Sequence, residues 1–80
     1  MRRLAKNEEE LAARIAAYLK GEIAKSGQTY EGFAREMKKH GLTETKASVT
    51  NKLARGTFPA TFLLGALAAL EADGIRLEDV

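Results

Sequence analysis

The chain has 80 residues, which is enough for one small domain with a modest hydrophobic core. It contains no cysteine, so a disulfide framework and thiolate metal sites are excluded. Its formal net charge is +2, and no apolar run reaches the roughly 18 residues that a membrane span requires.

The first predicted helix covers residues 8–26. Asn7 suits its N-cap, and Glu10 follows three residues later, as in a capping box. Its apolar residues recur at every fourth position, at Leu11, Ile15, Leu19 and Ile23. Gly27 is expected to end the helix. The first ten residues, MRRLAKNEEE, lack the apolar stretch of a secretory signal, so we expect a cytoplasmic protein.

Residues 29–56 predict a pair of helices joined by a turn. Thr29 suits the N-cap of the first of these helices, and Gly41 follows its end. Its buried stripe is expected at Tyr30, Phe33, Ala34 and Met37. Either Thr43 or Thr45 caps the next helix, which Gly56 ends.

The helix predicted between residue 43 and residue 55 has two contrasting sides. At 100° per residue, Val49 and Leu53 lie on one side and face the core. Lys46 and Lys52 flank the opposite side. That side suits a DNA major groove, because an Asn side chain can bond adenine, an Arg side chain can bond guanine and a small methyl group can meet the methyl of thymine. The residues expected to read bases are Ala47, Ser48, Asn51 and Arg55.

Charge is distributed unevenly along the chain. Residues 35–55 hold six basic and two acidic side chains, residues 56–70 hold none, and residues 71–80 hold four acidic and one basic. The positive charge therefore collects around the predicted reading helix, where DNA phosphates need it. A solvated basic face that binds nothing is the alternative interpretation.

A fourth helix is predicted at about residues 59–73, with Pro59 in its first turn. Its segment Phe62–Leu70 is apolar almost all round, which indicates a place in the core or at a subunit interface. In the tail, GIRLEDV, we expect a short fifth helix with Ile75, Leu77 and Val80 turned inward. No segment alternates with period two, so the sequence predicts an all-α bundle of four to five helices in a single domain, residues 1–80.

The sequence offers no set of residues suited to catalysis. No phosphate-cradling, zinc or calcium motif is present. His40, the only histidine, has no second nitrogen or sulfur ligand nearby in the sequence. We therefore expect no enzymatic activity, no metal and no cofactor.

Three stretches of the chain together resemble the lambda-repressor-like (Cro/repressor) helix-turn-helix family. They are TYEGFA at 29–34, ASVTNKLARG at 47–56, and FLLGALAAL followed by DGIRLEDV. The chain is similar to an atypical small bacterial variant of that family, because the span Phe33–Gly56 is several residues longer than usual and Gly32 lies inside the second helix. The resemblance implies a bundle of four to five helices that contains a helix-turn-helix, at about residues 29–56.

In that family the third helix reads bases and the start of the second helix contacts phosphate. The resemblance implies that Ser48, Asn51, Lys52 and Arg55 read bases. Together with the positive charge around the third helix, it predicts phosphate contacts at Gln28, Thr29, Tyr30, Lys38, Lys39, Lys46 and Lys52.

Two hypotheses about function follow. The first is a sequence-specific DNA-binding transcriptional regulator that acts as a homodimer on double-stranded DNA, because a two-fold protein on a two-fold site doubles the contacts of one half-site. The second is a helical protein-interaction module, accessory or antitoxin-like, that does not read DNA. In that case the helix Phe62–Leu70 would be the surface for a protein partner. The basic third-helix face distinguishes them, since an interaction module does not need it.

Overall fold

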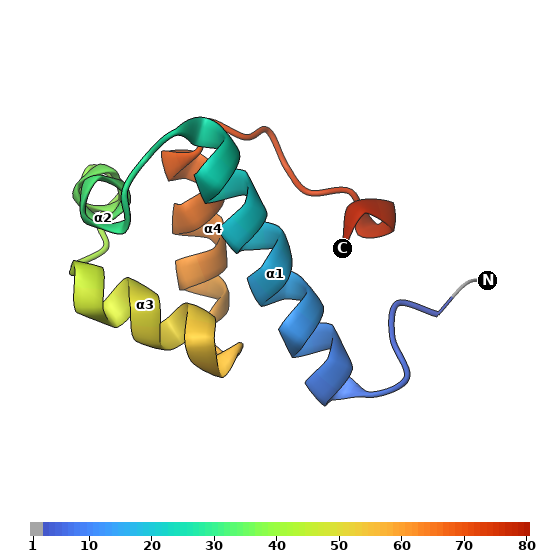
Figure 1. Cartoon of the computed structure of the whole chain (residues 1–80). Helices are drawn as coiled ribbons and strands as arrows, with labels where there is room; N and C mark the ends of the chain where they lie inside the picture. The colour runs from blue at the N-terminus through green and yellow to red at the C-terminus, as the bar shows by residue number, and fades with distance from the viewer. Residues whose placement is uncertain (1–2) are drawn as a thin grey trace.

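Four α-helices and one short turn make up the regular structure of residues 3–80, the part of the chain that this computed structural model describes. They are α1 (Glu8–Ser26), α2 (Tyr30–Lys38), α3 (Lys46–Arg55), α4 (Ala60–Ala69) and a 3₁₀ turn, Leu77–Asp79 (Figure 1). No strand occurs within these 78 described residues. The predicted all-α class is confirmed, with four helices.

α1 begins and ends where local signals predict. The Asn7 Oδ1 accepts a hydrogen bond from the Glu10 backbone N at 2.8 Å. The Glu10 carboxylate does not complete a capping box, because it accepts instead from the Lys6 backbone N, at 3.4 Å. Gly27 ends the helix with φ 77°, a left-handed conformation that glycine adopts without strain.

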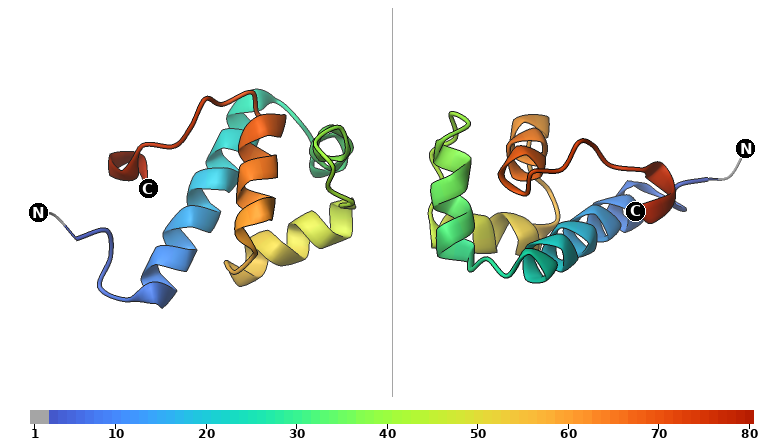
Figure 2. Two further views of the ribbon diagram at one scale, coloured as in Figure 1. Left: turned by 180° about the vertical axis from the view of Figure 1, so that it is seen from behind. Right: turned by 90° about the horizontal axis from the view of Figure 1, so that it is seen from above.

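The turn between α2 and α3, residues 39–45, is long because it doubles back along α2 before α3 starts (Figure 2, right). It begins with a hydrogen bond from the Leu42 N to the Met37 O at 3.2 Å. Leu42 then packs directly onto Gly65 of α4. A Cβ at position 65 would lie 2.5 Å from the Leu42 Cδ1. The absence of a side chain at Gly65 therefore makes room for the turn on α4.

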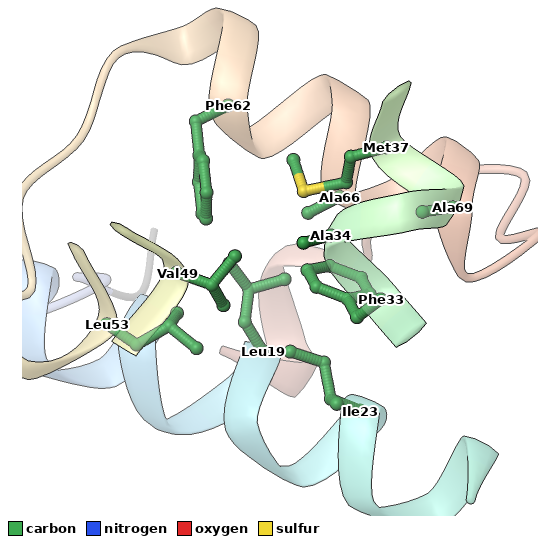
Figure 3. Packing of buried hydrophobic residues seen from close by; sticks show 10 residues of the cluster. All are labelled: Leu19, Ile23, Phe33, Ala34, Met37, Val49, Leu53, Phe62, Ala66 and Ala69. Carbon is green, nitrogen blue, oxygen red and sulfur yellow. The ribbon is translucent and has the colours of Figure 1, made fainter. Parts of the chain in front are cut away.

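All four helices contribute side chains to one core, which lies between them (Figure 3). The main helix contacts are α1 with α3, α2 with α3, and α2 with α4. Among residues 3–80 no polar or charged residue is buried, so the core is held by apolar packing. Its buried members are Leu19, Ile23, Phe33, Ala34, Met37, Val49, Leu53, Phe62, Ala66 and Ala69.

The fourth helix is shorter than the predicted 59–73. It begins after Pro59, which is its N-cap, and ends at Ala69. Glu71 takes a left-handed conformation, φ 58°, and the Ala72 N then donates to the Leu67 O at 2.9 Å. This hydrogen bond pairs a backbone carbonyl at the end of α4 and turns the chain away from the helix. The apolar sequence pattern continues beyond the point where the backbone leaves the helix.

The predicted fifth helix is reduced to the 3₁₀ turn. Ile75 and Val80 are half-buried, but Leu77 is 67% exposed, so the expectation that all three face inward is wrong for Leu77. The turn and residues 3–7 before α1 both lie on the side of α1 away from α2 and α3 (Figures 1 and 2). The tail therefore does not cover α3.

Candidate nucleic-acid interface

The outer face of α3 is the exposed half of that helix, formed by Lys46, Ala47, Thr50, Asn51, Ala54 and Arg55. On the opposite side Val49 and Leu53 are buried in the core. α3 lies at an edge of the molecule, and no other element of the described chain passes over its outer side (Figure 1). A helix so placed is accessible to a large partner along its whole length.

Asn51 and Arg55 lie on the outer face one helical turn apart, and Arg55 is the last residue of α3. Both side chains are exposed, and they take part in none of the hydrogen bonds or ion pairs formed among residues 3–80. An amide and a guanidinium in this state offer their donors and the amide oxygen to an external partner. Ala47 is exposed beside them, as predicted.

Thr50 and Ala54 also belong to the outer face, although the sequence pattern did not single them out. Both are exposed, and the Thr50 Oγ1 donates to the Lys46 O at 2.8 Å within the helix. The helical wheel places them between Lys46 and Asn51, so the signal was present. They keep that part of the face free of long side chains.

Ser48 does not lie free on the surface, in contrast to its predicted place among the base-reading residues. Its Oγ accepts from the Thr45 N at 2.8 Å and donates to the Glu44 Oε1 at 2.6 Å. Its own backbone N donates to the Thr45 Oγ1 at 3.1 Å, which completes a capping box. Thr45 is thus the N-cap of α3, and the Ser48 hydroxyl is already engaged within the protein.

Lys52 is turned toward α4 and does not project outward as a phosphate contact would. Its Nζ lies 2.7 Å from the Glu44 Oε2, and the side chains of Lys52 and Glu44 are 24% and 6% exposed. The same Nζ lies 5.0 Å from the centre of the Phe62 ring, within the range of a cation–π contact. The lysine charge is therefore compensated inside the protein.

The residues predicted to touch phosphate at the start of α2 are mostly engaged in the fold. The Thr29 Oγ1 accepts from the Gly32 N at 3.0 Å and caps the helix. Tyr30 is half-buried against the core. The Gln28 Nε2 lies 3.5 Å from the Ala69 O, and the Gln28 Oε1 is buried without a partner. Of the three, Thr29 is the exposed one.

The predicted basic residues do not come together on one surface. Lys38 and Lys39 lie at the C-terminal end of α2, which extends away from α3 (Figure 2, right), and the Lys39 Nζ pairs with the Glu36 Oε1 at 3.0 Å. Lys46 and Arg55 are the basic residues of the outer face of α3. The positive charge at this face is thus smaller than the sequence indicated.

The C-terminal end of α3 is held against α1. Gly56 is buried with φ 75°, and a Cβ at this position would lie 3.3 Å from the Ala12 O. Next to this contact an open groove of about 720 Å³ runs between α1 and the α3–α4 corner, with Leu11, Ile15 and Phe58 in its lining. The close approach fixes where α3 ends relative to α1.

Two further properties of the described residues bear on what the surface can bind. No three side chains of the types that ligate metals are grouped so as to hold an ion within residues 3–80. Across the same residues, every helix is too short or too polar to cross a membrane.

A family model described as "Domain of unknown function (DUF6471)" matches residues 11–75, which contain most of α1 and the whole of α2, α3 and α4. No curated protein and no solved structure matches the chain.

Proposed function

We propose that this chain, which belongs to the DUF6471 family, is a sequence-specific DNA-binding protein that places the outer face of α3 in a major groove. The observation that carries the proposal is the pair Asn51 and Arg55, exposed and unengaged within residues 3–80, on an uncovered helix. Asn pairs with adenine and Arg with guanine through two hydrogen bonds each, and both patterns are presented in the major groove.

The small residues of the outer face support a close approach to DNA. Ala47, Thr50 and Ala54 leave the backbone of α3 near the surface, so a helix in the groove brings Asn51 within reach of base edges. Lys46 at the start of the helix supplies a charge for phosphate. We further propose that α2, the turn 39–45 and α3 form a lambda-repressor-like helix-turn-helix with a lengthened turn.

The proposed protein acts as a homodimer and regulates transcription. A domain of this size contacts one half-site, and a second copy doubles the number of contacts. The uncharged segment 56–70 supports self-association, because Leu64 of α4 is 66% exposed there. Because the segment carries no charge, two copies of it can meet without repulsion between like charges.

Selection of bound sequences from random duplex DNA tests the proposal. We expect enrichment of a palindromic site. On that site Asn51→Ala should weaken binding by roughly 1–3 kcal/mol, with little effect on random DNA. Lys46→Ala should weaken binding to both and lower the salt dependence by about one ion.

Lys25→Ala is the matched control for Lys46→Ala, because it removes an exposed lysine from α1. It should leave both affinities close to those of the unchanged chain. If Asn51→Ala and Lys46→Ala are equally silent, α3 does not read DNA.

The alternative, a helical interaction module of accessory or antitoxin-like kind, also has an observation in its favour. Lys52 is turned inward, so the protein presents less positive charge than its sequence indicated, and Leu64 is exposed on α4. This alternative predicts that no DNA sequence is enriched. It also predicts that Leu64→Glu, and not Asn51→Ala, abolishes binding to the protein partner.

A further inference from the structure

The Glu44 carboxylate joins the long turn to two successive helical turns of α3. Glu44 lies in the turn, and its side chain is only 6% exposed. The Oε1 accepts from the Ser48 Oγ at 2.6 Å, and the Oε2 accepts from the Lys52 Nζ at 2.7 Å. Both carboxylate oxygens are therefore occupied by residues on one edge of α3.

Lys52 extends this connection to the core. Its Nζ lies 5.0 Å from the centre of the Phe62 ring, and Phe62 is 1% exposed in α4. The ammonium group is thus held between a nearly buried carboxylate and a buried aromatic ring. Turn, α3 and α4 meet at this single charge pair.

The contacts of Glu44 add to the burial of Val49 and Leu53 in fixing which way α3 is turned about its axis. Ser48 and Lys52 are four residues apart and lie on the same edge of the helix. Asn51 lies about 100° round the helix from Lys52, on the outer face. With the Ser48–Lys52 edge held against the turn and α4, and Val49 and Leu53 in the core, Asn51 and Arg55 remain on the exposed side of the helix.

We propose that Glu44 is a positioning residue for the outer face of α3. It does not touch DNA, and acts through Lys52 and Ser48 by holding the rotation of the helix at which Asn51 and Arg55 project together. The proposal rests on the proposed function, because it concerns how α3 is presented to a duplex. It removes Lys52 from the set of phosphate contacts and gives it a role inside the protein.

Glu44 and Lys52 are buried to different extents, so loss of the ion pair has a different cost for each of them. Lys52 is 24% exposed, so without Glu44 its ammonium can turn toward water. Glu44, at 6%, cannot reach water in the same way, and without Lys52 its charge is left uncompensated. Lys52→Met should therefore lower the free energy of unfolding more than Glu44→Gln does.

The main test compares Glu44→Gln on two duplexes, the selected site and a scrambled duplex of the same length. The substitution adds one unit of positive charge, so electrostatics alone strengthens binding to both. Positioning predicts the opposite on the selected site, a loss of about tenfold, which equals one lost base contact. On the scrambled duplex the affinity should not fall.

The matched control is Glu22→Gln in α1. It adds the same charge and breaks an ion pair of similar length, in which the Lys25 Nζ lies 2.9 Å from the Glu22 Oε2, but Lys25 is 79% exposed. The control should not weaken binding to either duplex. Equal behaviour of Glu44→Gln and Glu22→Gln would overturn the proposal.

A second readout does not need DNA. In ¹H–¹⁵N spectra of the full chain, Glu44→Gln should shift the amide signals of Asn51 and Arg55, and Glu22→Gln should leave them in place. If the unchanged chain enriches no DNA sequence, the proposed function fails, and these shifts still decide whether Glu44 positions α3. Unshifted signals of both residues would overturn the proposal even if the chain binds DNA. If Lys52→Met does not fold, Glu44→Gln alone decides.

Discussion

The two ends of α3 are held in different ways. At the N-terminal end the contacts are made by side chains, through the Thr45–Ser48 capping box and the Glu44 carboxylate, which Lys52 reaches from the last turn of the helix. At the C-terminal end the contact is made by backbone, because Gly56 lies against the Ala12 carbonyl of α1. One end depends on polar groups in the right places, and the other depends on the absence of a side chain.

This difference shows which part of α3 can be adjusted by substitution. A side-chain contact can be weakened in steps, since each hydrogen bond contributes about 1 kcal/mol. A close approach of two backbones is harder to adjust, because a Cβ added at position 56 would lie 3.3 Å from the Ala12 O and the backbone would have to shift by a few tenths of an ångström. We therefore expect substitutions at the C-terminal end to affect stability most, and those at the N-terminal end to affect orientation.

Gly56→Ala tests the C-terminal end and should have the largest effect. It places a side chain in a left-handed conformation and 3.3 Å from the Ala12 O, so we expect the free energy of unfolding to fall by about 2 kcal/mol. Gly27→Ala is the control, because Gly27 has φ 77° but no atom within 4 Å of the added Cβ. It should cost about 1 kcal/mol. Equal losses in urea unfolding would show that the contact with Ala12 does not hold the end of α3.

Gly65→Ala tests how the turn before α3 is seated on α4. The added Cβ would lie 2.5 Å from the Leu42 Cδ1 and 2.9 Å from its Cδ2, so the leucine must move. We expect a loss of about 1–2 kcal/mol, typical of overpacking. In a double-mutant cycle with Leu42→Ala, the combined loss should be smaller than the sum of the single losses. Additive losses would mean that Leu42 does not pack on Gly65.

Thr45→Ala tests the side-chain contacts at the N-terminal end. It removes the hydroxyl that accepts from the Ser48 N, and we expect it to lower the free energy of unfolding by about 1 kcal/mol. Thr43→Ala, two residues earlier at an exposed position, should change it by less than about 0.5 kcal/mol. A larger effect at Thr43 than at Thr45 would show that Thr45 is not the N-cap of α3.

The smallest expected effect on stability comes from the ionisation of Tyr18 in α1 at alkaline pH, away from both ends of α3. Burial and the neighbouring carboxylates of Glu22 and Asp79 raise the pKa of Tyr18 above 10.0. The folded state therefore holds the Tyr18 proton more tightly, so this stabilisation is complete below pH 10 and is lost as pH rises through the higher folded pKa. Tyr18→Phe should lessen the decline in urea midpoint between pH 9 and 11, and Gly56→Ala should not. An unchanged decline in Tyr18→Phe would contradict this account.

The helix boundaries were predictable where the signal is local. Asn7 and Thr29 cap helices by accepting from a backbone N three residues later, and Gly27 and Gly56 end helices by adopting positive φ. Each of these contacts lies within a few residues of sequence. The end of α4 was not predictable in the same way, because the apolar pattern continues through Leu70 although the backbone turns at Glu71.

The candidate site was predictable in part for a related reason. Helical geometry alone places Asn51 and Arg55 opposite Val49, so their exposure follows from sequence. The contacts of Ser48 and Lys52 do not follow from the sequence, because they depend on where the turn brings the Glu44 carboxylate. That path is set by the packing of the turn on α4, which spacing along the chain does not reveal.

The interleaved helix contacts have a consequence for how the chain folds as it is made. α1 packs mainly on α3, and α2 packs on α3 and α4, so the first two helices form no core of their own. A chain emerging from the ribosome cannot close the core until α4, Ala60–Ala69, has left the exit tunnel. The same arrangement makes any half of the molecule unstable alone and joins the four helices into one all-or-none folding unit.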